Sequence, residues 1–164
     1  MSERIVSQAE EINIDEMMAK FDRESDFRRL TGILSRVVAA IAIAFSLFQL
    51  YTANFGVLDA QLQRAVHLSF ALALVYLLYP TRHSWPRNRL HWLDAVLAVL
   101  AAAAPLYIVQ FYDQLVIRAG TVTSADMIVG AMGVLFVLEA ARRVVGWPIV
   151  IVASVFLVYA LSLI

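Results

Sequence analysis

The sequence contains no cysteine and few charged residues. Without cysteine it cannot form disulfides, thiolate nucleophiles or Cys-ligated zinc and iron–sulfur sites. Charged residues make up 16% and apolar residues 62% of the 164 positions, whereas soluble proteins average roughly 25% and about 45–50%. This composition predicts an all-α, polytopic helical membrane protein with four to five transmembrane helices and a short cytoplasmic N-terminal helix.

The common motifs of nucleotide, metal and hydrolase sites are also missing. The sequence has no GxGxxG, no Gly-Lys-Ser/Thr phosphate loop, no HExxH and no GxSxG. Thirteen basic residues balance thirteen acidic ones, so no excess positive charge favours nucleic acid as a partner. We therefore expect no enzyme activity, no catalytic residue, and no cofactor or metal site in this chain.

The N-terminal segment, residues 1–27, carries eight acidic and three basic residues. This acidic start is the opposite of a signal peptide, so no cleavage is expected. Ser7-Gln8-Ala9-Glu10 has the form of a helix capping box, and an apolar stripe at helical spacing follows it: Ile14, Met17, Met18 and Phe21. Three interpretations stay open: a solvated tail, a helix that docks on a protein partner, and a membrane-surface helix, which the acidic flanks disfavour.

Apolar runs predict the membrane spans, because a helix needs roughly 20 residues to cross the hydrocarbon core. Residues 28–146 are expected to form a four-helix domain with spans at about 32–51, 63–79, 93–111 and 126–145. Pro105 should kink the third span. The fourth spans only if it continues through the charged residues near its end; otherwise it lies at the interface. Residues 147–164 form a fifth apolar run without a polar tail, so we expect a fragment of a longer protein.

The arginines of the short connections predict the orientation. Eight fall on one side of the expected spans and two, Arg64 and Arg118, on the other. The eight are Arg28, Arg29, Arg36, Arg82, Arg87, Arg89, Arg142 and Arg143. Because such residues are retained on the cytoplasmic side, the N-terminus is expected to be cytoplasmic.

Two polar clusters stand out as structural or interface candidates. Arg64 and His67 are three residues apart and so share a helix face. The favoured interpretation is an interfacial arginine that meets phosphates and a histidine hydrogen-bonded between helices; the alternative is a role in ion or substrate passage. Glu139 reaches Arg142 at i+3 and Arg143 at i+4, either as a local pair at a cytoplasmic anchor or as an interdomain contact.

The remaining candidate is Asp94, in the first turn of the third span. Like Glu139 and Asp126 it lies near a predicted helix end, whereas a proton-coupled pump would place a carboxylate deep in a span. Only the third span has an internal proline, so the paired broken helices of many secondary transporters are missing. The sequence therefore predicts a helical module without a substrate site of its own.

Several segments follow one another in a recognisable order: Ser46-Leu47-Phe48-Gln49-Leu50-Tyr51, Gln63-Arg64-Ala65-Val66-His67-Leu68, Leu78-Tyr79-Pro80, Asp94, Tyr107, Asp126, and Val137-Leu138-Glu139-Ala140-Ala141-Arg142-Arg143-Val144-Val145-Gly146. Their order and spacing resemble the small, four-span (Q-type) domain at the N-terminus of fused permeases of the tripartite ATP-independent periplasmic (TRAP) transporters. The resemblance covers about residues 28–159.

The resemblance implies a scaffold in the bacterial inner membrane that serves uptake of small organic anions, expected to be carboxylates. Its expected partners are the lipid bilayer, a periplasmic substrate-binding protein and a large transporter domain, fused or separate. In that family the large domain holds the substrate and the coupling ion, expected to be sodium, and residues 147–164 resemble the helix leading to it. The main alternative is a stand-alone membrane interaction or assembly protein with no transport role.

Overall fold

The computed structural model describes residues 28, 30–56, 58–81 and 90–162. Within these ranges the chain forms helices joined by short turns and contains no strand. The helices are α2 (Ile33–Phe55), α3 (Ala60–Leu78), α4 (Trp92–Gln110), α5 (Tyr112–Ile117), α6 (Ser124–Val144) and α7 (Trp147–Ser162). The N-terminal stripe of Ile14, Met17, Met18 and Phe21, like the connection 82–89, lies outside the described residues.

Four of these helices, α2, α3, α4 and α6, are long and apolar enough to cross a membrane. The protein is therefore an all-α, polytopic helical membrane protein, as the composition predicts. Helix α2 extends to Phe55, four residues past the expected end of the first span, and α6 runs through Glu139 and both following arginines. Helix α7 is apolar but has 16 residues, fewer than the roughly 20 that a perpendicular span needs.

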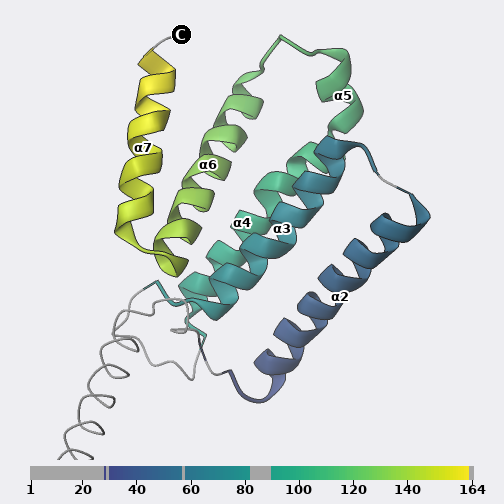
Figure 1. Ribbon diagram of the computed structural model, residues 1–164, viewed down its shortest axis with the longest axis vertical. Coiled ribbons are helices and arrows are strands. Elements are labelled where there is room, and N and C mark those ends of the chain that lie inside the picture. The colour runs from purple at the N-terminus through teal and green to yellow at the C-terminus, as the bar shows by residue number, and fades with distance from the viewer. Residues whose placement is uncertain (1–27, 29, 57, 82–89, 163–164) are drawn as a thin grey trace, which may run out of the picture.

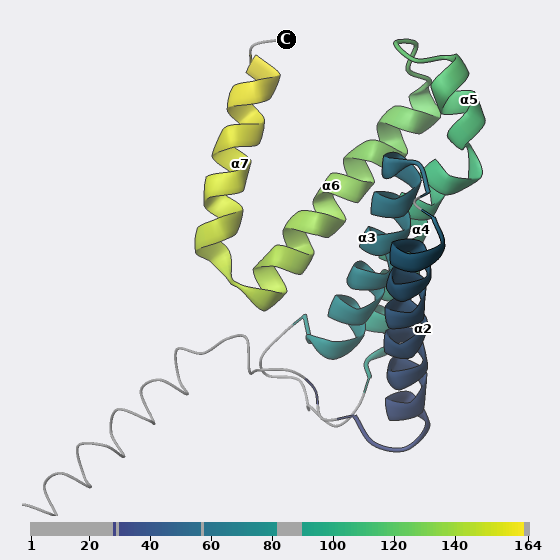
Figure 2. The ribbon, with the colours of Figure 1, turned by 45° about the vertical axis from the view of Figure 1, so that its right-hand side comes forward.

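Helices α3 and α4 form the central antiparallel pair, with α2 against α3 on one side and α6 across both (Figures 1 and 2). Their buried contact combines Leu72 and Tyr76 of α3 with Ala98 and Ala101 of α4. Small alanines allow the two backbones to approach closely, and the Ser69 hydroxyl donates a hydrogen bond to a carbonyl of α4 at 2.8 Å. This pair is the frame on which the other helices pack.

Local sequence features shape three places in the helices: the interior of α4, the start of α6 and the turn between α6 and α7. Pro105 lies inside α4, which nevertheless continues to Gln110. At the start of α6, the Thr123 hydroxyl and the Asp126 carboxylate cap each other's backbone N–H groups in a capping box. Gly146 has a φ of 110°, a left-handed conformation that favours glycine. The chain can therefore turn at Gly146, between the end of α6 at Val144 and the start of α7 at Trp147.

Candidate functional site: a buried arginine and carboxylate network

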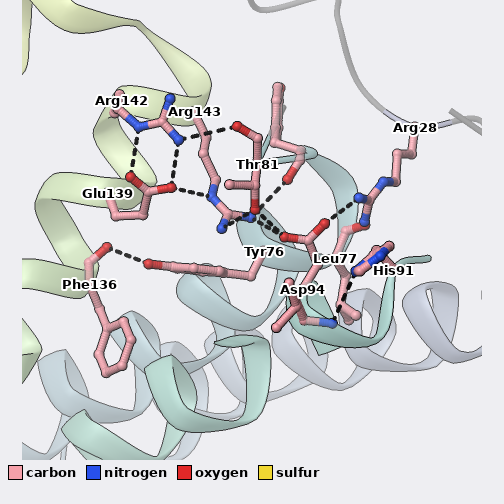
Figure 3. A network of polar contacts seen from close by, with 12 residues as sticks. Arg28, Tyr76, Leu77, Thr81, His91, Asp94, Phe136, Glu139, Arg142 and Arg143 are labelled. Atoms are coloured by element: carbon pink, nitrogen blue, oxygen red, sulfur yellow. Dashed lines mark hydrogen bonds and ion pairs between the residues drawn. The ribbon is translucent and has the colours of Figure 1, made fainter. Parts of the chain in front are cut away.

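Asp94 is the centre of a network at the end of the bundle where α3 and α6 end and α4 and α7 begin (Figure 3). Its carboxylate is fully buried and accepts hydrogen bonds from Arg28, from the Thr81 hydroxyl and from Arg143, the last at 3.0 Å. Its position in the first turn of α4 also places its negative charge at the positive end of the helix dipole. The burial of this charge is thus compensated by two guanidinium groups, a hydroxyl and the helix itself.

Arg143, in the last turn of α6, makes the largest number of these contacts. Besides the bond to Asp94, its guanidinium donates to the Thr81 hydroxyl at 2.8 Å, to the Tyr79 carbonyl at 3.1 Å and to Glu139 at 3.0 Å. The side chain is 0% exposed. A guanidinium presents five N–H groups in a planar fork, which explains how one residue can bind two carboxylates and the end of α3 together.

The Arg143 guanidinium lies over the ring of Tyr76. The centre of the Arg143 guanidinium lies 4.2 Å from the centroid of the Tyr76 ring, a cation–π contact. The Tyr76 hydroxyl donates to the Phe136 carbonyl of α6 at 3.1 Å, and the two rings meet edge to face. Tyr76 therefore joins α3 to α6 through both its ring and its hydroxyl.

Glu139 forms the second acidic position and pairs with both of the arginines that follow it. Its carboxylate accepts two hydrogen bonds from Arg142 at 2.7 Å and one from Arg143 at 3.0 Å. The pairing expected from the i+3 and i+4 spacing is confirmed. Arg142 also donates to the Thr81 carbonyl at 3.3 Å and lies 5.7 Å from the ring centroid of Trp147. It thus connects the end of α6 to the start of α7.

Arg28 brings the segment before α2 into the same network. Its backbone N–H donates to the Leu78 carbonyl at 2.8 Å, and its guanidinium contacts the Leu77 carbonyl and Asp94. The residue is 2% exposed, and its Nε has no hydrogen-bond partner among the described residues. Arg28 therefore anchors the chain before α2 to the end of α3 and the start of α4.

The network contains three arginines and two carboxylates, which leaves one positive charge in excess. Both carboxylates accept hydrogen bonds from guanidinium groups that stay protonated, so their negative charges are balanced within the network. Among the described residues, no group of three or more His, Cys, Asp or Glu side chains could hold a metal ion. This arrangement joins the ends of α3, α4 and α6 to one another and to Arg28, which precedes α2.

A smaller polar cluster lies at the opposite end of the bundle, near α5. The Asp126 carboxylate accepts hydrogen bonds from the Tyr107 hydroxyl at 2.8 Å and from Arg118 at 2.9 Å. Nearby, a hydrogen bond from Tyr112 to Asp59 raises the pKa of the Tyr112 phenol above its usual value. These contacts join the start of α6 to α4 and α5, and the start of α5 to the start of α3.

Arg64 and His67 have different neighbours, although both lie on α3. His67 shares a hydrogen bond with Gln49 of α2 through Nδ1, and its ring lies 4.9 Å from that of Phe45. This is the histidine bonded between helices that the favoured interpretation expected. Arg64 is exposed and lines a cavity that α4 and α6 also line. The two residues therefore do not form one polar site.

Of the six candidates, the structure brings four together in the network: Asp94, Glu139, Arg142 and Arg143. Sequence reasoning missed Arg28, Thr81 and Tyr76 as members. Arg28 counted only as an orientation signal, yet a buried carboxylate in an apolar helix needs cationic partners. The sequence could therefore have indicated that Asp94 pairs with an arginine. The positions of the arginines in the sequence do not show which of them does so.

No protein-family model matches the sequence, and no curated protein or solved structure shows a significant match to it. The resemblance to the TRAP small domain therefore stays an interpretation of the sequence motifs.

Proposed function

We propose that this chain is the scaffold part of a TRAP-type secondary transporter that imports small organic anions, expected to be carboxylates. The observation that best supports this is the buried network around Asp94, which joins α3, α4 and α6 to one another and to Arg28. A scaffold must keep its shape while another domain moves against it. A network with several partners for each charge suits that task. If the helices moved apart, buried charges would lose their partners, which costs several kcal/mol.

Exposed apolar faces also support a scaffold that works with a second membrane domain. None of the α7 side chains is buried, and α2 has Thr52 as its one buried residue. Ile43, Leu47 and Leu50 on α2 and Phe156 on α7 are each more than half exposed. These faces can contact lipid or a large transporter domain. In the proposal that domain holds the substrate and the coupling ion, expected to be sodium.

The proposal includes an orientation in the bacterial inner membrane. The end of the bundle that holds the network carries Arg28, Arg142 and Arg143, whereas Arg64 and Arg118 lie toward the opposite end. Because arginines are retained on the cytoplasmic side, the network end faces the cytoplasm. The α5 end then faces the periplasm, where a substrate-binding protein would deliver the anion.

Reconstitution into liposomes tests this function. The chain alone should take up no labelled organic acid under an inward sodium gradient, and uptake should require the large domain and the periplasmic binding protein. The Asp94→Asn variant should reduce uptake by the complete system, while Asp113→Asn, on the exposed surface of α5, should not. Sodium-driven uptake by these 164 residues alone would contradict the scaffold assignment.

The alternative is a stand-alone membrane interaction or assembly protein. The exposed faces of α2 and α7 favour it equally, since a partner other than a transporter domain could cover them. Purification from native membranes separates the two. A large polytopic partner with organic-anion uptake supports the transporter, whereas a stable complex that lacks transport activity supports the alternative.

A further inference from the structure

A cavity of about 1020 Å³ lies on the side of the bundle away from α2, between α3, α4, α5, α6 and α7. Its lining is apolar except for four residues: Gln61, Arg64, Tyr107 and Asp126. All four lie at the α5 end, in the first two turns of α3, the first turn of α6 and the last turn of α4. The cavity is therefore polar at one end and apolar along the rest of its length.

The length of the cavity matches one leaflet of a membrane. Its lining on α6 extends from Asp126 to Leu138, which corresponds to roughly 18 Å along a helix. One leaflet contributes about 15 Å, half of a hydrocarbon core of about 30 Å. The polar end coincides with the ends of the spanning helices, where lipid headgroups lie. An apolar cavity of this size at membrane depth does not favour water, so an apolar chain is its natural occupant.

The glycines of α6 keep this cavity open. Gly130 and Gly133 line it, and a Cβ atom added at either position would meet nothing within 4 Å. Ala104 and Pro105 of α4 line the same cavity. Larger side chains at the two glycine positions would therefore fill this cavity, which we call the groove from here on.

Arg64 supplies the charge that identifies the occupant. Its side chain lines the polar end, is exposed and has no hydrogen bond or ion pair with any described residue. Asp126, the acidic group nearby, is already bound by Arg118, Tyr107 and Thr123. An unpaired guanidinium at the headgroup level attracts a phosphate. A helix of another protein could fill this cavity and pair with Arg64 only if it carried an acidic side chain at the same position.

We propose that the groove binds a glycerophospholipid, with an acyl chain between α4 and α6 and the headgroup phosphate on Arg64. This site does not depend on the transport proposal, since it uses only the shape of the groove and the unpaired arginine. It differs from general contact with the bilayer because the phosphate of one lipid molecule binds a specific arginine and its acyl chain fills a defined cavity.

Native mass spectrometry of the purified chain in detergent tests the phosphate contact. Added phosphatidylglycerol should bind at one tightest site, at least tenfold more strongly than diacylglycerol with the same chains. Arg64→Gln should weaken that binding by about fivefold or more, while Arg36→Gln, an exposed arginine at the start of α2, should leave it unchanged. Equal effects of the two variants, or equal binding of diacylglycerol, would overturn the proposal.

Filling the groove tests where the acyl chain lies. Gly133→Leu should displace the bound lipid, Gly133→Ala should weaken it less, and Ala44→Leu on the exposed face of α2 should have no effect. Circular dichroism verifies that each variant keeps its helices. Inorganic phosphate should not compete with the lipid. Competition by phosphate would show a free-anion site instead, and lipid retention by a folded Gly133→Leu variant would place the lipid elsewhere; either result overturns the proposal.

Discussion

Asp94 in the first turn of α4 and Arg143 in the last turn of α6 form a buried ion pair at 3.0 Å, although 49 residues separate them in the sequence. Each charge also suits its own helix, because an acid stabilises a helix N-terminus and a base a C-terminus. This ion pair therefore stabilises the start of α4 and the end of α6, and it also holds the two helices against each other.

Removal of the acid from this pair is expected to destabilise the protein strongly. Asp94→Asn leaves the buried Arg28 without its carboxylate partner and leaves Arg143 with Glu139 as its remaining acidic partner among the described residues. The variant should lower the free energy of unfolding by about 3–5 kcal/mol. Reversible unfolding of the purified chain in mixed micelles measures the change. Asp113→Asn on exposed α5 is the control and should stay within about 0.5 kcal/mol of the parent. Equal stability of the two variants would show that the network contributes nothing.

Glu139 and Arg142 should show energetic coupling. Their two hydrogen bonds at 2.7 Å predict that Glu139→Gln and Arg142→Gln are non-additive, with a coupling of about 0.5–3 kcal/mol in a double-mutant cycle. Arg142→Gln alone should cost less than Arg143→Gln, because the Arg142 side chain is 24% exposed and that of Arg143 is 0% exposed. Additive effects would mean that the pair is held in place by its neighbours and carries no energy of its own.

The sequence predicted the helices better than the network. Long apolar runs identify spans because each helix satisfies its own backbone hydrogen bonds within the bilayer, and the local Glu139 pair follows from helical spacing. The contacts of Arg28 and Thr81 with Asp94 depend on which helices become neighbours. The short helix α5 was not expected, since its six residues are fewer than a periodic pattern needs.

The proposed orientation can be tested by cysteine labelling, since the chain has no cysteine of its own. Cysteines placed at Leu58 and Ala119 in the expected periplasmic connections should react with an impermeant thiol reagent in intact cells. A cysteine at Ser84 should react only after the membrane is permeabilised. The reverse pattern would invert the topology.

The N-terminal stripe is predicted to be a docking face. Met17→Ser together with Phe21→Ser should lower the yield of the assembled complex or its transport activity, because these changes remove apolar area from the stripe. Glu16→Ser with Arg23→Ser, on the opposite side of the expected helix, is the matched control. Unchanged yield and activity in the first variant would support the solvated-tail interpretation.

The turn at Gly146 has a mechanical consequence for α7. Helix α7 begins one residue after this glycine, has no buried side chain and diverges from α6 with distance from the turn (Figure 2). Its 16 residues form a rod of about 24 Å. A rotation of only 10° about the turn would move the far end of α7, at Ser162, by roughly 4 Å. Small backbone adjustments beside Arg142 and Trp147 are thus amplified along α7, as by a lever pivoted on the rigid end of the bundle.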